Sequence, residues 1–261
     1  MAARLTQVAV TGAMGGMGIT VVKAILQSGA DVIAIDRAAE PSAPHREELQ
    51  RTAERSGTIV DYYQCDISKL ESASAVFEVA VSSARYPLRG LVNCAAIGWV
   101  GPSISFPVED AKRIIEVNLI GTLICAQAAA QLVKKHNFSA SFVFIASMSG
   151  YVVNKGTPNA AYAASKAGVH QLTRNLASEW GHLEDGPSIR VNSVSPGVIR
   201  TPMTASVLSN GDFEQLWTEE TMLKRLSAPE DYRGPIVFLL SDASSYVTGA
   251  DLLVDGGYTG W

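Results

Sequence analysis

Seven short runs that contain β-branched residues alternate along the chain with longer stretches of helical periodicity. This order is the one expected for stacked β-α-β units, in which helices cross over between parallel strands. The predicted strands span residues 5–10, 31–35, 58–64, 90–93, 141–146, 189–194 and 251–254. Since such crossovers are right-handed, we expect an α/β fold with a doubly wound, seven-stranded parallel sheet and helices on both faces. Ligands of such sheets bind beyond the carboxyl ends of the strands.

The chain has 261 residues, of which 47% are hydrophobic and 18% are charged, a composition typical of a well-filled globular core. We expect residues 1–261 to form a single domain. Two capping-box patterns, Ser68-x-x-Glu71 and Ser227-x-x-Glu230, predict helix starts. Residues 199–226 form a long segment without a clear strand, and we interpret this segment as a substrate lid.

Charge and cysteine content exclude several kinds of partner. The formal net charge is −4 and the basic residues are scattered, so neither nucleic acid nor an anionic membrane is expected to bind. Cys65, Cys94 and Cys125 lack the paired spacing of a zinc site, and we expect buried thiols and no metal. No uninterrupted apolar run reaches membrane-spanning length, and the first strand pattern starts close to Met1, which favours the cytoplasm.

The first predicted strand runs into a glycine-rich turn that opens a helical pattern over residues 19–27. Glycine tolerates positive φ and has no side chain, so amides at the helix N-terminus can approach a pyrophosphate closely. An ordinary tight turn between a strand and a helix has the same composition, so this turn alone is weak evidence. With the acidic residue described next, it indicates a Rossmann-type cofactor site formed by Gly12, Met14, Gly16, Met17 and Gly18.

Asp36 ends the second predicted strand, 18 residues beyond Gly18, where a carboxylate can accept hydrogen bonds from the adenosine ribose. A carboxylate at this position also repels a 2′-phosphate, and Met14 adds no basic group, so the sequence favours NAD over NADP. Arg37 leaves NADP as an alternative, because its guanidinium can pair with a 2′-phosphate if Asp36 turns away.

Two further strand ends carry candidate cofactor contacts. Asp66 and Ile67 follow the third strand and can hold the adenine edge through a carboxylate and a backbone amide, since Ser68 is expected to provide the helix cap. Asn93 and Ala95 end the fourth strand, where small residues let the chain pass beneath a cofactor. Ordinary packing of small residues explains the second motif equally well.

The pattern Tyr162-Ala-Ala-Ser-Lys166 lies within a helical pattern over residues 160–180. Residues four apart share a helix face, so the Lys166 ammonium can favour the phenolate form of Tyr162. An exposed Tyr and Lys pair is common in helices. However, the fifth strand delivers Ser147 to the same sheet edge, where its hydroxyl can bind a substrate oxygen.

With these motifs in order, the whole chain resembles the short-chain dehydrogenase/reductase family, in particular its polyol and ketose oxidoreductases. The resemblance implies that Tyr162 is the acid/base, Ser147 positions the substrate oxygen, and Lys166 tunes Tyr162 and holds the nicotinamide ribose. It also implies that Asn118, which alone would be a helix-interior polar residue, anchors a proton-relay water. A further set is implied to meet the nicotinamide carboxamide: Pro196, Gly197, Ile199 and Thr201.

Two positions depart from the common family pattern. Cys94 stands where the family usually has a second asparagine, an apolar substitution that should preserve the shape. Many members place the serine 13 residues before the tyrosine, which selects Ser149, whereas the following glycine spacing selects Ser147. We prefer Ser147 as the catalytic serine and expect Ser149 to contact substrate or to pack without a role.

The expected reaction is the reversible oxidation of a secondary alcohol to a ketone, with a proton passing to Tyr162. A polyol and ketose pair is one substrate class, with Ser149 and Asn154 as polar contacts. Trp99 and the apolar residues of 199–226 suit an apolar cyclic ketone or steroid-like alcohol better, but packing within the lid explains these residues at least as well. A dinucleotide-binding regulator without turnover is the alternative from another class.

Small residues on the helix of Tyr162 predict an assembly. Ala163, Ala164, Ala167 and Gly168 allow close helix packing, and Leu172, Leu176 and Trp180 add apolar area. Together with the family resemblance, they predict a homotetramer, with a homodimer as the fallback.

Overall fold

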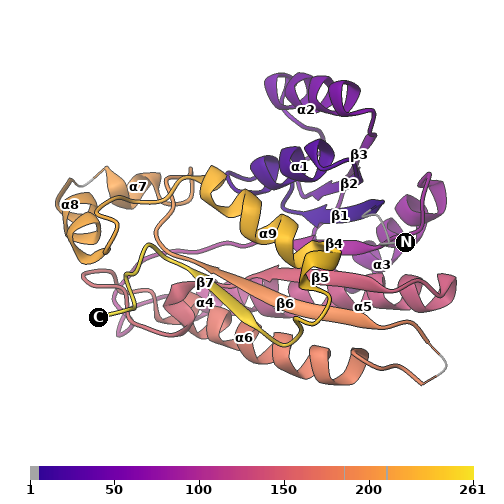
Figure 1. Ribbon diagram of the computed structural model, residues 1–261. Coiled ribbons are helices and arrows are strands. Elements are labelled where there is room, and N and C mark those ends of the chain that lie inside the picture. Colours follow the sequence, from indigo (N-terminus) through magenta and orange to yellow (C-terminus); the bar gives the residue numbers. More distant parts are fainter. Residues whose placement is uncertain (1–5, 185, 210) are drawn as a thin grey trace.

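The computed structural model describes residues 6–184, 186–209 and 211–261, and these residues form one doubly wound α/β unit (Figure 1). All seven strands are parallel, in the order β3-β2-β1-β4-β5-β6-β7. Their bounds are β1 Gln7–Thr11, β2 Asp31–Asp36, β3 Val60–Gln64, β4 Gly90–Asn93, β5 Ala140–Ile145, β6 Ile189–Pro196 and β7 Asp251–Val254. The predicted fold is confirmed, and two strands have the predicted bounds. The predicted first residue of β1, Leu5, lies outside the described residues.

Helices cover both faces of the sheet. Their bounds are α1 Gly18–Gln27, α2 Ala43–Ser56, α3 Leu70–Ser83, α4 Val108–Ile115, α5 Gly121–His136, α6 Ala160–Trp180, α7 Ala205–Leu208, α8 Gly211–Glu220 and α9 Arg233–Leu240. One layer contains α3, α5 and α6, and the other contains α1, α2 and α9. Alternate strand residues point to the two layers, so Phe142 and Phe144 of β5 lie in one core while Val143 lies in the other.

Both predicted capping boxes are wrong, because the serine hydroxyls bind other groups. Ser68 donates its hydroxyl hydrogen bond to Asp66, and α3 begins two residues later at Leu70. Ser227 donates to the carbonyl of Val198 instead of capping a helix. A 3-10 turn, Pro229–Tyr232, follows, and the Asp231 carboxylate accepts the Ala228 amide.

Residues 199–226 contain the two helices α7 and α8, which lie beyond the carboxyl ends of the strands, toward the left of Figure 1. These helices share a small apolar core with Met148, Val198 and Tyr258. The segment therefore packs directly on the turn that follows β5.

One continuous helix, Val108–His136, is long and apolar enough to pass a membrane-span test, although no such run is expected from the sequence. More than half of its most apolar window, 56%, is buried inside the protein. Its second half, α5, packs on α3 and contributes Ile124, Cys125 and Leu132 to the core. We therefore interpret it as a core helix.

Candidate active site

The glycine-rich turn lies where the strand order reverses, between β1 and β4. Gly12 has a φ of +62°, and a Cβ atom there would lie 2.6 Å from the Ala95 backbone. A Cβ at Gly18 would lie 2.0 Å from the Gly12 carbonyl oxygen. Both positions therefore require glycine, and the turn after β4 closes directly on the turn after β1.

The start of α1 leaves backbone donors available. Among the described residues, the amides of Gly16, Met17 and Gly18 have no hydrogen-bond acceptor, as expected for the first turn of a helix. A Cβ at Gly16 would lie 2.9 Å from Thr201, so the 201–202 turn after β6 covers the glycine loop. This cradle of free amides, two of them on glycines, fits the pyrophosphate of a dinucleotide.

Asp36 is fixed at the end of β2 by two backbone amides. Its carboxylate oxygens accept Met14 N–H at 2.9 Å and Ala38 N–H at 3.3 Å. A cavity of about 550 Å³ begins beside Met14 and extends along residues 38–46. The Asp36 carboxylate is thus bound to the amides of Met14 and Ala38, two residues that line this cavity.

Asp66, a predicted adenine contact, also has partners within the protein, and its side chain is 40% exposed. Its carboxylate accepts Ser68 and forms an ion pair with Arg113 of α4 at 3.0 Å. These hydrogen bonds and the nearby guanidinium hold the pKa of Asp66 below its ordinary value although burial acts in the opposite direction. The backbone amide of Ile67 has no acceptor in the described part of the chain and remains a candidate adenine contact.

A buried hydrogen-bond chain joins β1, β4 and α5. Thr11 donates to Asn93 at 2.5 Å, Asn93 donates to Thr122 at 2.8 Å, and Thr122 donates to the carbonyl of Asn118 at 2.6 Å. Asn93 therefore holds the sheet edge together beneath the cleft. Sequence reasoning missed Thr122, although its place four residues after Asn118 on one helix face is a usable signal.

Asn118 lies in a π-helical segment, Glu116–Ile120, between α4 and α5. Its side-chain amide accepts Ile97 N–H at 2.8 Å and donates to the Ile97 carbonyl at 2.8 Å. It also donates to Ser165, which lies between Tyr162 and Lys166 on α6. Asn118 therefore fixes the loop after β4 and the catalytic helix relative to each other, and π-bulges of this kind are frequent at functional sites.

Tyr162 lies in the first turn of α6, with its ring against Gly98, where a Cβ would lie 2.9 Å from Cδ2. Burial raises the pKa of the phenol above its ordinary value, while a hydrogen bond with the Ser147 hydroxyl lowers it. Desolvation is the larger effect, so the pKa moves in the direction opposite to the one expected from Lys166. In this state Tyr162 is a protonated acid at neutral pH.

Lys166 is 2% exposed and donates to the Ile145 carbonyl at 2.7 Å, while its ammonium lies 5.7 Å from the Tyr162 ring centroid. Burial lowers its pKa to about 8. Cys94 lies close enough for the two groups to shift each other's pKa. Lys166 is thus held beneath the cleft, between the strand ends and Tyr162.

Ser147, Ser149 and Asn154 form a second chain. Ser147 donates to Ser149 at 3.2 Å, and Ser149 donates to the side-chain amide oxygen of Asn154 at 2.8 Å. Of the two serines, Ser147 is the one that faces the Tyr162 phenol. The Asn154 amide nitrogen has no acceptor among the described side chains and carbonyls, so it can bind a substrate hydroxyl.

The turn after β6 brings the last predicted cofactor residues to the same edge. Pro196 ends the strand, the Gly197 amide donates to Val254 of β7 at 3.0 Å, and the Thr204 hydroxyl donates to the Ile199 carbonyl at 2.5 Å. The Ile199 amide has no acceptor within the described ranges. Thr201 covers Gly16, so this turn meets the glycine loop.

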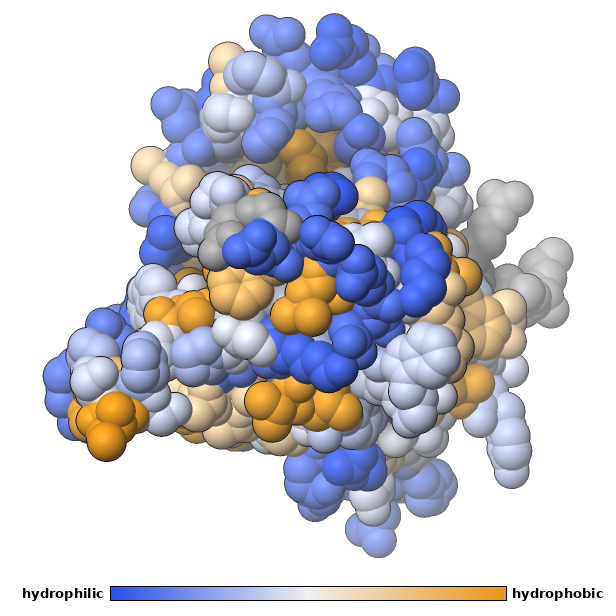
Figure 2. All heavy atoms as spheres, turned by 90° about the vertical axis from the view of Figure 1, so that its left-hand side faces the viewer, coloured by the Kyte–Doolittle hydropathy of each residue, from blue (hydrophilic) through white to orange (hydrophobic). Residues whose placement is uncertain are grey.

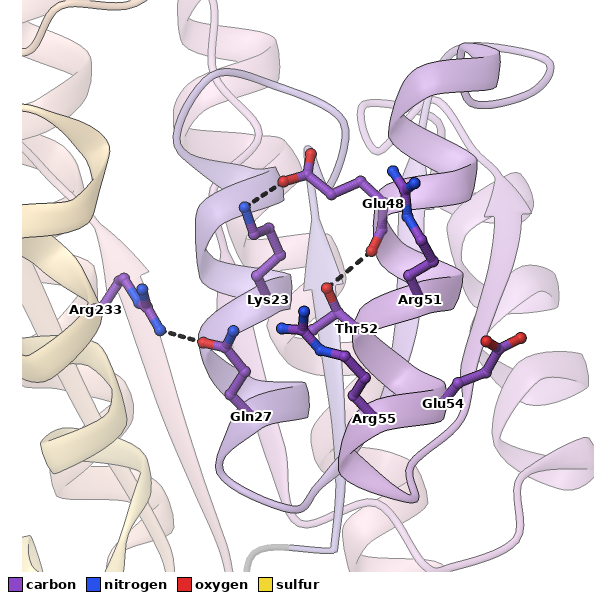
Figure 3. Close-up of a pocket in the computed structure, with 8 residues that line it drawn as sticks. All are labelled: Lys23, Gln27, Glu48, Arg51, Thr52, Glu54, Arg55 and Arg233. Carbon is purple, nitrogen blue, oxygen red and sulfur yellow. Dashed lines mark hydrogen bonds and ion pairs between the residues drawn. The ribbon is translucent and has the colours of Figure 1, made fainter.

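The face beyond the strand ends is turned to the viewer in Figure 2, where apolar patches interrupt a hydrophilic surface. Exposed apolar residues of the segments around the site include Trp99 (44% exposed), Val153 (84%) and Met203 (46%). A second cavity, of about 530 Å³, lies between α1, α2 and α9, and none of the predicted site residues lines it (Figure 3). Its lining is mainly charged, and it lies apart from the predicted site.

Known proteins share this arrangement. Residues 12–259 match the family model described as Enoyl-(Acyl carrier protein) reductase. A short chain dehydrogenase/reductase of Aspergillus versicolor is 45% identical over 97% of this chain and 86% of its own length. An NADH-dependent L-xylulose reductase of Ambrosiozyma monospora is 38% identical over 97% of this chain and 94% of its own length. The crystal structure of an NADPH-dependent 3-quinuclidinone reductase from Rhodotorula rubra has a TM-score of 0.87 at 32% identity, covering 97% of this chain and 91% of that chain. The chain belongs to the short-chain dehydrogenase/reductase family.

Proposed function

We propose that the protein reversibly oxidises a secondary alcohol to a ketone with a nicotinamide dinucleotide as redox partner. The observation that carries this proposal is the Tyr162 phenol next to the Ser147 hydroxyl, with Lys166 beneath them, at the sheet edge that also holds the glycine cradle. The bound nicotinamide supplies or accepts the hydride. A regulator without turnover would have no need for this arrangement of acid, hydroxyl and ammonium.

The chain's own groups move the proton. In the reductive direction, Ser147 donates a hydrogen bond to the carbonyl oxygen and Tyr162 gives its proton to the same oxygen. In the oxidative direction, the Tyr162 oxygen takes the alcohol proton. The raised pKa of the buried phenol favours the reductive step at neutral pH.

Backbone amides and the side chains of Asp36 and Lys166 would hold the cofactor. The amides of residues 16–18 fit the pyrophosphate, Asp36 the adenosine ribose, and the Ile67 amide the adenine. By the family resemblance, Lys166 would hold the nicotinamide ribose and the Ile199 amide the carboxamide.

NAD is the cofactor we propose. The Met14 and Ala38 amides hold the Asp36 carboxylate at the end of β2. Arg37 can pair with a 2′-phosphate only if Asp36 turns away, and these two hydrogen bonds oppose that movement.

Asp36→Ala should therefore lower the ratio of kcat/KM for NADH to kcat/KM for NADPH by about tenfold or more, because one like-charge repulsion and two ribose hydrogen bonds disappear. Steady-state kinetics with both cofactors measures the ratio, and Asp61→Ala on β3 is the control. A wild-type enzyme that prefers NADPH would contradict the assignment.

A polyol and ketose pair is the substrate class that the polar groups support. Ser149 orients Asn154, whose amide nitrogen is available at the site, and the L-xylulose reductase is a relative by name. The exposed Trp99, Val153 and Met203 favour the alternative, an apolar cyclic ketone or steroid-like alcohol. A screen of NADH and NADPH absorbance over polyols, ketoses, cyclic ketones and steroids separates the two. Absence of turnover on every secondary alcohol and ketone would contradict the proposed function.

We also propose a homotetramer that works in the cytoplasm. Ala164 and Ala167 are exposed on α6, whereas Leu176 is buried and Trp180 packs edge-on against Phe142 in the core. The apolar area predicted from Leu172, Leu176 and Trp180 therefore belongs mainly to the core, and the exposed alanines support the contact.

Ala167→Arg is expected to split the assembly, because a guanidinium in place of a methyl group prevents close helix packing. Gln50→Arg, on the opposite layer, should leave it intact. Light scattering at micromolar concentration measures the mass of each variant. A wild-type protein that is monomeric and fully active at 27.7 kDa would contradict the assembly.

A further inference from the structure

His170 is a buried titratable residue that the proposed reaction does not use. It lies on α6, four residues after Lys166, and is 3% exposed. Burial lowers the pKa of its imidazole below the ordinary value, so the ring is neutral at neutral pH. A neutral histidine inside a core needs hydrogen-bond partners, and these partners indicate its role.

On one side, the imidazole contacts the turn that carries the catalytic serine. A Cβ atom at Gly150 would lie 2.6 Å from His170 Cε1 and 2.9 Å from Nδ1. The Tyr151 ring, which follows in the chain, stacks on the imidazole with centroids 4.1 Å apart. The 3-10 turn Met148–Gly150 therefore lies directly against the ring, and the Ser147 hydroxyl accepts the Ser149 amide of that turn at 3.1 Å.

On the other side, the sheet holds the imidazole. His170 Nε2 lies 2.8 Å from Ser195 Oγ on β6, and Ser195 donates to Asp251 Oδ1 on β7 at 2.9 Å. Because the Ser195 proton goes to Asp251, its oxygen accepts from histidine, which assigns the His170 proton to Nε2. Ser193 donates to the same Asp251 oxygen. Asp251, Ser195 and His170 thus form a chain from β7 through β6 to α6.

We propose that His170 is a positioning residue that sets the place of Ser147 relative to Tyr162. The two catalytic groups come from different elements, the turn after β5 and the helix α6, and the imidazole fills the space between the turn and the sheet. The chain to Asp251 fixes the ring, and the ring fixes the turn. This inference rests on the proposed function, because it concerns the same acid and the same hydroxyl.

Loss of the ring has a consequence for the phenol. Without the imidazole, the turn can relax into the space that the ring leaves, and Ser147 moves relative to Tyr162. The hydrogen bond with Ser147 lowers the pKa of Tyr162, so its weakening raises that pKa further. Ketone reduction requires the protonated phenol and falls as pH rises through this pKa. The alkaline limb of kcat/KM should therefore move to higher pH.

The test compares His170→Ala, His170→Gln and Leu176→Ala in the full-length protein. We expect His170→Ala to lower kcat for ketone reduction by about tenfold, from misplacement of the reacting groups, and to shift the alkaline limb upward. His170→Gln keeps a donor for Ser195, so it should restore part of kcat and part of the wild-type position of the alkaline limb. Leu176→Ala creates a cavity two turns further along α6 and should lower stability without moving the limb. The affinity for NADH, measured by fluorescence titration, should stay within about twofold in all three.

A second variant tests the inference independently of whether His170→Ala folds. Ser195→Ala keeps the ring but removes its acceptor, and it should shift the limb in the same direction by a smaller amount. Folded His170 and Ser195 variants with an unmoved limb and normal kcat would overturn the inference, as would an equal shift in Leu176→Ala. The proposed function fails by a different result, namely normal turnover in a variant that lacks the Tyr162 hydroxyl.

Discussion

Tyr162→Phe is expected to lower kcat by on the order of 10² or more, because the substitution removes the proton that the reaction exchanges. The phenyl ring retains the contact with Gly98, so the cleft keeps its shape. Binding of NADH, followed by fluorescence titration, should remain. Tyr246→Phe is the matched control, since the Tyr246 side chain is fully exposed and far from any assigned role.

The pH profile of the wild-type enzyme gives an independent measurement of the same group. Burial raises the pKa of Tyr162, so the phenol stays protonated across neutral pH. Ketone reduction should therefore hold its rate through neutral pH and decline only in the alkaline range, whereas alcohol oxidation should rise with pH. Near-normal turnover of Tyr162→Phe on the best substrate would show that another group supplies the proton.

The sequence predicts the sheet, and which residues lie at its carboxyl edge, because both depend on local pattern. The runs 90–93 and 251–254 have the predicted bounds, and parallel strands deliver their ends to one edge. For this reason Asp36, Asn93 and Ser147, which lie at the ends of three different strands, are on the same edge of the sheet. Helix starts were less predictable, because Ser68 and Ser227 have partners outside the local helix turn.

Side-chain partners that are distant in sequence could not be predicted. The Asp251 carboxylate is joined to His170 through Ser195, and no local pattern pairs residues so far apart. The sequence also does not show which of two opposing effects on the pKa of Tyr162 is the larger. From the sequence, the Lys166 charge is expected to lower the pKa of Tyr162, but the depth of burial that reverses this direction exists only in the fold.

Ser147→Ala should reduce kcat by on the order of 10², and Ser149→Ala by only a few-fold, because a single hydroxyl can meet the substrate oxygen beside Tyr162. Both serines are buried, so exposure does not separate them. Their hydrogen bonds separate the two serines. Ser147 faces the phenol, whereas Ser149 directs its proton to Asn154.

The two serines also differ in what their loss leaves behind. Ser147→Ala removes the hydrogen bond that lowers the pKa of Tyr162, so its alkaline limb should shift to higher pH, as in the His170 variants. Ser149→Ala leaves that bond in place and releases Asn154, so its effect should appear in KM for a polyol or ketose rather than in the pH profile. Steady-state kinetics across pH on both variants measures the two quantities together. The reverse order of kcat losses would move the catalytic role to Ser149, and the hydrogen bond from Ser149 to Asn154 would then have to open when substrate binds.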